Sequence, residues 1–168
     1  MSTLKSLVIQ RIEPKHARNL IVMTKEEAEF QKMLDQVTNT EEKLRSDIRR
    51  GDVDGFIAFD GEEPIGMVLF GYSYSTWVNQ IINVESIYVR EKYRRFHIGK
   101  KLWMEAVKVA KERGIARMQW ICLNWNTNAM EFYEKMHARN LSAEEGWLLY
   151  KLGSQEIDKL VADHKLIN

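Results

Sequence analysis

The sequence predicts one mixed α/β domain in which helices pack on a central sheet. Segments with the apolar spacing of helices alternate with strand-like segments, and short turns separate them. The elements follow the order βαα, a hairpin, and then β-α-β-α-β, which is typical of a single mixed α/β layer structure. With 168 residues the chain is long enough to bury a core, and no repeat or linker interrupts it, so we expect a single domain over residues 1–168.

The first elements are a strand and two helices. Residues 7–12 are predicted as a strand. Pro14 suits a helix start, and helical apolar spacing continues to about Met33. Thr40, followed by two glutamates, is a good N-cap for a second helix that ends near Gly51.

The middle of the chain alternates strands with one long helix. Residues 55–59 and 65–74 are predicted as a hairpin joined by the turn at 60–63. Another strand is predicted at 81–89. From 99 to 112 apolar residues line one side of a helix, and a glycine shortly afterwards supplies a left-handed end.

The last third is predicted to hold two strands and short helices. Residues 118–123 are predicted as a strand, and Asn126 is predicted to cap a short helix. Residues 147–152 are predicted as the final strand, and the tail at 155–160 as a helix.

Composition argues against several classes of protein. The net charge is +1, so no global field favours nucleic acid or an anionic membrane. The start of the chain does not resemble a signal peptide, and no apolar run approaches the roughly 20 residues of a membrane span. Cys122 is the only cysteine, and the histidines lack metal-ligand spacing, so we expect no disulfide and no metal site. A cytoplasmic protein is the resulting expectation.

Basic residues crowd the junction between the strand at 81–89 and the helix that follows it. A helix N-terminus offers free N–H groups and a partial positive charge, which suit phosphate. Arg94 and Arg95 precede the helix. Lys100 and Lys101 lie in its first turn, where each exposed cation opposes the dipole at a cost of about 0.3–1 kcal/mol. A bound polyanion removes this conflict; a solvated basic turn is the alternative.

This junction resembles the cofactor loop of the GNAT acyltransferases. Arg94-x-x-His97-x-Gly99 lies where that family carries Arg/Gln-x-x-Gly-x-Gly/Ala for the pyrophosphate of acetyl-CoA. Four further segments are similar to the diamine acetyltransferase branch and its thialysine relatives: YSTW (74–77), VESIYV (84–89), WNTNAMEFY (125–133) and NLSAEEGWLLYKL (140–152). The resemblance implies the GNAT fold, a mostly antiparallel twisted sheet with splayed strands flanked by helices.

The resemblance also implies acetyl-CoA as cofactor, with CoA as product. It implies cofactor contacts along one strand, the basic loop and a later helix: Ile87, Tyr88, Val89, Arg94, Arg95, Phe96, His97, Ile98, Gly99, Lys100, Asn126 and Tyr133. Arg95, His97 and His137 replace family glycines, which bears on cofactor affinity more than on the fold. We expect His97 to keep its N–H donor only with a negative φ and an imidazole turned away from the phosphates.

Two side chains are expected to carry the chemistry. The resemblance places Tyr133 near the cofactor sulfur, where a phenol with a pKa near 10 can donate a proton; a core aromatic is the alternative. Glu85 is the expected base or water organiser. Strand alternation puts it on the side of Ile81 and Ile87, where a carboxylate needs a partner such as a cationic amine. The alternative is a solvated strand face.

Substrate residues are implied at Gln31, Ser75, Trp77 and Glu85. Polyamines carry several cations and favour several carboxylates. Gln31 and Ser75 are neutral where the diamine branch is acidic, so a small primary amine, thialysine or a lysine analogue, is favoured. The alternatives are a polyamine acetyltransferase, a catalytically weak GNAT-like binding protein and, less favoured, a protein or histone acetyltransferase. The resemblance further implies a homodimer with the active site near the subunit interface.

Overall fold

The computed structural model describes residues 4–165 and forms two compact units, Met1–Ile121 and Cys122–Asn168. The first unit contains a five-stranded sheet with the spatial order β1-β2-β3-β4-β5. Its strands are β1 (Leu7–Arg11), β2 (Asp54–Asp60), β3 (Glu63–Ser75), β4 (Asn79–Val89) and β5 (Met118–Gln119). The first four pair antiparallel, and β5 runs parallel to β4. The predicted mostly antiparallel mixed sheet is confirmed.

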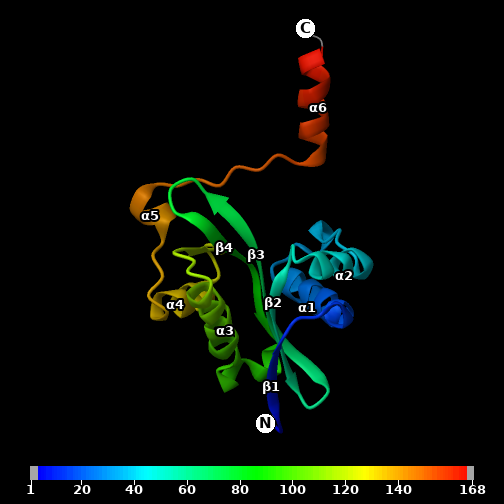
Figure 1. Ribbon diagram of the computed structural model, residues 1–168, viewed down its shortest axis with the longest axis vertical. Helices are drawn as coiled ribbons and strands as arrows, with labels where there is room; N and C mark the ends of the chain where they lie inside the picture. The colour runs from blue at the N-terminus through cyan, green and yellow to red at the C-terminus, as the bar shows by residue number, and fades with distance from the viewer. Residues whose placement is uncertain (1–3, 166–168) are drawn as a thin grey trace. The chain divides into compact units, whose positions relative to one another are not determined.

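Helices cover both faces of this sheet. They are η1 (Pro14–His16), α1 (Ala17–Phe30), η2 (Leu34–Gln36), α2 (Glu41–Arg50), η3 (Glu91–Phe96) and α3 (Ile98–Glu112). Figure 1 shows α1 and α2 on one face and α3 on the other. The predicted caps of α2 are confirmed, since the Thr40 hydroxyl accepts from the Lys43 N–H at 3.2 Å and Gly51 is left-handed with φ 81°.

Apolar side chains explain why the helices dock where they do. Under α1 and α2 a buried cluster joins both helices to the sheet: Ile12, Ala17, Leu20, Ile21, Met23, Leu44, Ile57, Met67 and Leu69. The side of α3 predicted to be apolar is buried against the opposite face: Leu102, Ala106, Val109 and Ala110. Burying each large aliphatic side chain contributes about 1.5–3 kcal/mol, so this packing holds the helices on both faces of the sheet.

The second unit is helical over its described residues. It contains α4 (Thr127–Lys135), α5 (Leu141–Glu145) and α6 (Ser154–Lys165). The predicted cap of α4 is confirmed by the Asn126 side chain, which accepts from the Ala129 N–H at 3.3 Å. The predicted tail helix is also confirmed and is longer than expected. Among residues 4–165, no helix has the length and apolarity to cross a membrane.

Two strand predictions are wrong. β5 contains two residues instead of the six predicted at 118–123, and residues 147–152 form no strand. A strand needs a neighbour for its N–H and C=O groups. The described part of the second unit holds no such neighbour, and Leu149 and Tyr150 are 75% and 85% exposed. A short apolar run therefore forms a strand only where a neighbouring strand edge is present.

Candidate active site

A β-bulge interrupts β4 at Glu85. Ser86 pairs with Leu69 of β3 and Val84 pairs with Phe70, so Glu85 is the extra residue between two paired positions. The Glu85 side chain is exposed, and its carboxylate accepts a hydrogen bond from the Asn83 amide at 3.4 Å. The bulge therefore leaves Glu85 exposed and out of the regular pairing between β3 and β4.

The bulge overturns the predicted alternation of β4. Ile81 pairs with Ser73 and Ile87 pairs with Val68, five residues apart on β3. Paired residues share a face and alternate residues change face, so Ile81 and Ile87 point to opposite faces. The prediction that Glu85 shares one apolar face with both was therefore wrong, because a single extra residue reverses the pattern.

Beyond the bulge, β4 separates from β5. The pairing between the two strands covers Ile82 and Asn83, whereas β4 stays paired with β3 as far as Val89. Along Ile87–Val89, the edge of β4 away from β3 therefore has no β5 partner in the described residues, and on it the Val89 carbonyl accepts a hydrogen bond from Arg94. The splayed strands expected of the GNAT fold are present, and this edge offers N–H and C=O groups to an extended ligand.

The basic loop follows directly as η3 and the start of α3. Arg94 and Arg95 are exposed in the last turn of η3. The Arg94 Nε donates to the Val89 carbonyl at 3.0 Å, and its guanidinium lies 5.1 Å from the centre of the Phe30 ring on α1. Among the residues that the structure describes, no side chain caps α3 at its N-cap, and the first turn of this helix holds no acidic residue. Helix dipole and cations together favour an anion here.

Two histidines at family glycine positions adopt the glycine conformation. His97 has φ 57° and His137 has φ 63°, both left-handed. The expectation of a negative φ at His97 was wrong. Histidine is among the residues that tolerate this region, at a cost of roughly 1–2 kcal/mol. The chain therefore turns at His97 as it would with glycine, and the N–H groups of the following helical turn keep their direction.

Gly99 tests whether this loop fits a pyrophosphate. A Cβ added there would meet, among the described residues, the Cγ2 of Val89 at 3.8 Å, which is an ordinary contact. Neither a positive φ nor tight packing requires glycine at this position. The hydrogen in place of a side chain at Gly99 would let a phosphate approach the main chain in the first turn of α3 closely. Phe96 is partly buried, Lys100 is exposed and Ile98 is fully buried, so Ile98 can offer its backbone alone.

The predicted substrate residues lie at opposite ends of β4. Gln31 is the C-cap of α1, beside Phe30, whose ring contacts Arg94 near the end of β4. Ser75 ends β3 at the hairpin and accepts a hydrogen bond from the Trp77 N–H at 3.3 Å. Ten residue steps along β4 span about 30 Å at ~3.3 Å per residue. Within one chain, the structure does not bring Gln31 together with Ser75 and Trp77.

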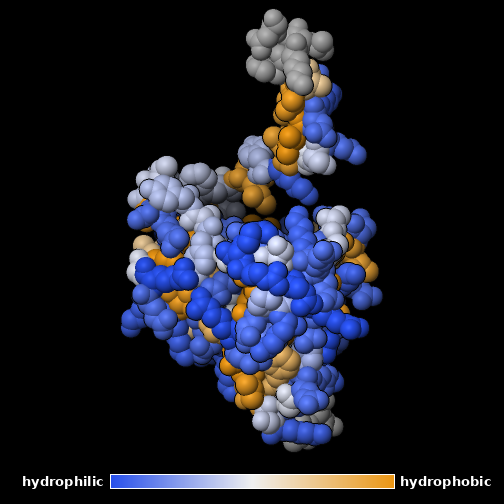
Figure 2. Space-filling view, turned by 45° about the vertical axis from the view of Figure 1, so that its right-hand side comes forward, coloured by the Kyte–Doolittle hydropathy of each residue, from blue (hydrophilic) through white to orange (hydrophobic). Residues whose placement is uncertain are grey.

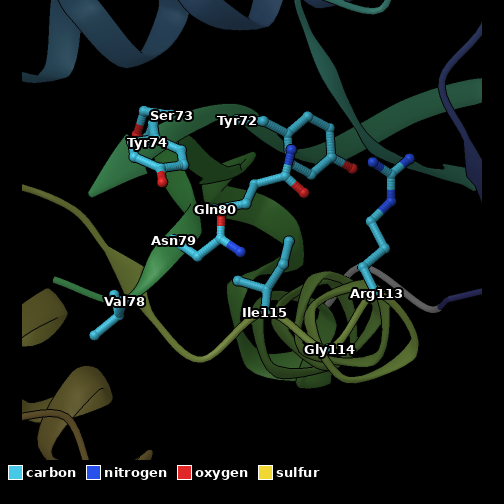
Figure 3. Close-up of a pocket in the computed structure, with 9 residues that line it drawn as sticks. All are labelled: Tyr72, Ser73, Tyr74, Val78, Asn79, Gln80, Arg113, Gly114 and Ile115. Carbon is cyan, nitrogen blue, oxygen red and sulfur yellow. The ribbon is translucent and has the colours of Figure 1, made fainter. Parts of the chain in front are cut away.

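A polar pocket of about 600 Å³ lies at the hairpin end of β4 (Figure 3). It is lined by Tyr72, Ser73, Tyr74, Val78, Asn79, Gln80, Arg113, Gly114 and Ile115. Figure 3 shows Arg113 reaching from the end of α3 toward Tyr72, and its guanidinium lies 4.3 Å from the ring centre. None of the predicted site residues lines this pocket, so it is separate from the bulge and the basic loop.

Comparison with known proteins agrees with this geometry. Residues 17–138 match the family model described as "Acetyltransferase (GNAT) family". The chain belongs to the GNAT family of acetyltransferases. Such proteins are acyltransferases, and this GNAT chain is one of them.

Three known proteins are similar to this GNAT chain over most of its length. A Caenorhabditis elegans protein named thialysine N-epsilon-acetyltransferase is 44% identical over 156 residues, covering 93% of this chain and 98% of that protein. A Sus scrofa protein of the same name is 32% identical, covering 92% and 97%. A crystal structure of a probable acetyltransferase superposes with a TM-score of 0.71 at 24% identity, covering 87% and 97%, and shows the shared fold.

Sequence reasoning missed Glu27 of this GNAT enzyme. Its carboxylate, on α1, accepts a hydrogen bond from the hydroxyl of Ser86, the residue after the bulge. Burial raises the pKa of the Glu27 carboxyl, and the Ser86 bond opposes that shift. The contact joins residues 59 positions apart, and no local pattern signals it.

Tyr133 and Asn126 belong to the second unit of the enzyme. Tyr133 is partly buried on α4, and its ring lies edge-to-face with that of Phe132 at 5.5 Å. Asn126 caps the same helix. The predicted contacts of Tyr133 with the cofactor sulfur and of Asn126 with the cofactor stay predictions.

Proposed function

We propose that this GNAT enzyme transfers the acetyl group of acetyl-CoA to the side-chain primary amine of thialysine or a closely similar lysine-like amino acid. The observation that carries the proposal is the match to the C. elegans relative of that name, which extends over nearly all of both chains. Neutral Gln31 and Ser75, where the diamine branch is acidic, favour this acceptor over a polyamine.

The cofactor is proposed to lie along the open edge of β4 and across the start of α3. Bound acetyl-CoA supplies an activated acetyl thioester. The backbone of Ile87–Val89 would pair with the amides of the pantetheine arm. The first N–H groups of α3 would hold the pyrophosphate, and Arg94 and Arg95 would add positive charge. The small Gly99 in the first turn of α3 and the lack of a side-chain cap on this helix among the described residues support this placement.

The chemistry assigned to the side chains is one direct transfer in a ternary complex. An alkylammonium has a pKa near 10, so it must lose a proton before its nitrogen can attack. Glu85 takes that proton through water. The nitrogen–carbon bond would form as the carbon–sulfur bond breaks, and Tyr133 would give its phenolic proton to the departing sulfur. The acetylated nitrogen would release its second proton, which would restore the Tyr133 phenol through water.

We further propose that the enzyme works as a homodimer. Gln31 and the pair Ser75 and Trp77 lie about 30 Å apart along β4, so they can line one acceptor site only if a second copy supplies one end. Between residues 148 and 152, the exposed apolar side chains are Leu148, Leu149, Tyr150 and Leu152, which a second copy could cover. Light scattering should give twice the 19.8 kDa chain mass; a monomeric mass contradicts this proposal.

A panel of amines tests the proposed function. Purified enzyme is given acetyl-CoA with thialysine, lysine, ornithine or spermidine, and release of free CoA is measured. The proposal expects kcat/KM for thialysine to exceed that for spermidine at least tenfold. A preference for spermidine would establish the polyamine alternative. No turnover together with no calorimetric binding of acetyl-CoA would point to a non-catalytic GNAT-like protein.

A further inference from the structure

Two adjacent glutamates near the end of α1 have opposite environments. Glu26 is neutralised by Arg90, which donates two hydrogen bonds to its carboxylate at 2.9 and 2.7 Å. Glu27 accepts from the neutral hydroxyl of Ser86. Among the described side chains of residues 4–163, no cation pairs with Glu27, and Ser86 is its one hydrogen-bond partner. The negative charge of Glu26 is therefore balanced by an arginine, whereas that of Glu27 is not.

The uncompensated carboxylate lies beside the β4 bulge. Ser86 pairs with Leu69, which belongs to the buried cluster under α1, so the Ser86 side chain faces α1. Glu27 meets it there, directly after Glu85 in the strand. Three polar side chains from two elements therefore gather where the pairing of β4 changes register.

Partial burial makes an unneutralised carboxylate costly. A neutral hydrogen bond recovers only part of the hydration that the ionised group loses, and burial accordingly raises the pKa of Glu27. A cation arriving at Glu27 would remove this cost. An alkylammonium carries three N–H donors and one positive charge, which match a carboxylate and a serine hydroxyl.

We infer that Glu27, supported by Ser86, binds the ammonium group of the acceptor and selects cationic amines over neutral molecules of the same shape. This inference rests on the proposed function, because it requires an amine to bind beside the bulge. It assigns Glu27 a binding role that differs from that of Glu85. Glu85 is exposed to water and accepts the proton of the amine, whereas Glu27 binds the positively charged ammonium group.

The experiment compares two ligands that differ in one group. Thialysine ends in an ammonium, and S-(2-hydroxyethyl)cysteine carries a hydroxyl in its place. Binding of each to the enzyme with CoA is measured by calorimetry, and the ratio of the two Kd values is taken. We expect the wild type to prefer thialysine at least tenfold, and Glu27→Gln to bring that ratio close to one. Glu26→Gln is the matched control and should keep the wild-type ratio.

Two additional readouts make the outcome decisive. Glu27→Gln should raise KM for thialysine at least tenfold while changing kcat and KM for acetyl-CoA less than threefold. Ser86→Ala, which keeps the carboxylate, should lower the ligand ratio only partly. An unchanged ratio in Glu27→Gln, with thialysine still acetylated, overturns this inference and leaves the proposed function standing. If the amine panel selects another amine, that amine and its alcohol are compared; if no amine is acetylated, both proposals fail.

Discussion

The two halves of β4 differ in how completely the protein satisfies its own polar groups. Just before the bulge, Ile82 and Asn83 are paired on both sides, with β3 and with β5. After the bulge the strand is paired with β3 alone, and it runs into the basic loop and α3. We call the part of β4 after the bulge its open end.

Two carboxylates on different elements show a similar contrast. At the start of β2, Asp54 accepts hydrogen bonds from Arg11, from the Tyr72 hydroxyl at 2.8 Å and from the Gly55 N–H at 2.8 Å. On α1, beside the bulge, Glu27 has a single neutral partner in the described chain. Polar groups that are mutually compensated mainly stabilise the fold, whereas groups left open can bind a ligand. Substitutions of the two kinds of group should therefore separate stability from activity.

The largest expected effect is on catalysis at the open end. Tyr133→Phe removes the proton donor proposed for the departing sulfur and leaves the ring in place. We expect kcat to fall about 100-fold, within the usual contribution of a positioned acid. Stopped-flow or steady-state CoA release gives kcat, and thermal melting checks that the fold is retained. Unchanged kcat would remove Tyr133 from the mechanism.

Asp54→Asn should lower stability by about 2 kcal/mol and leave kcat/KM unchanged, because the Asp54 carboxylate is compensated within the protein. Burial alone would raise the pKa of Asp54, but the bonds from Arg11, Tyr72 and Gly55 outweigh it and hold that pKa below its usual value. The stabilisation is therefore present above the ordinary carboxyl pKa and is lost as pH falls through the folded-state value. Urea unfolding should show a large gap between variant and wild type at pH 7 that shrinks below about pH 4. A gap independent of pH would contradict the assignment.

Interactions between residues close in the sequence allowed much of this fold to be predicted. Thr40, Gly51 and Asn126 mark helix ends through bonds within a few residues, and all three were found where expected. The bulge at Glu85 depends on how β4 aligns with β3, and the Glu27–Ser86 contact on how α1 docks. Neither is encoded in a local pattern. The strand prediction at 147–152 was wrong for the same reason, since a strand depends on a distant neighbour.

Gly99→Ala should separate binding from folding at the open end. The added methyl meets little of the protein, so the free enzyme should keep or gain stability, by up to about 1 kcal/mol for a helical glycine. It would occupy the space proposed for the pyrophosphate, and we expect Kd for acetyl-CoA to rise about tenfold. Calorimetry and thermal melting on the same samples measure both. Equal loss of stability and affinity would mean that the glycine serves the fold.

The smallest expected effect comes from His97→Gly. Glycine adopts the left-handed conformation without the strain borne by histidine but loses more entropy on folding, so the net gain should be below about 1 kcal/mol. His97→Ala keeps the strain and serves as the control, and His137→Gly repeats the test in the second unit. If the backbone at His97 positions the phosphates, acetyl-CoA affinity should be kept or improved in His97→Gly. Weaker binding would instead show that the imidazole itself contacts the cofactor, and the open end of β4 would then depend on a side chain as well as on the main chain.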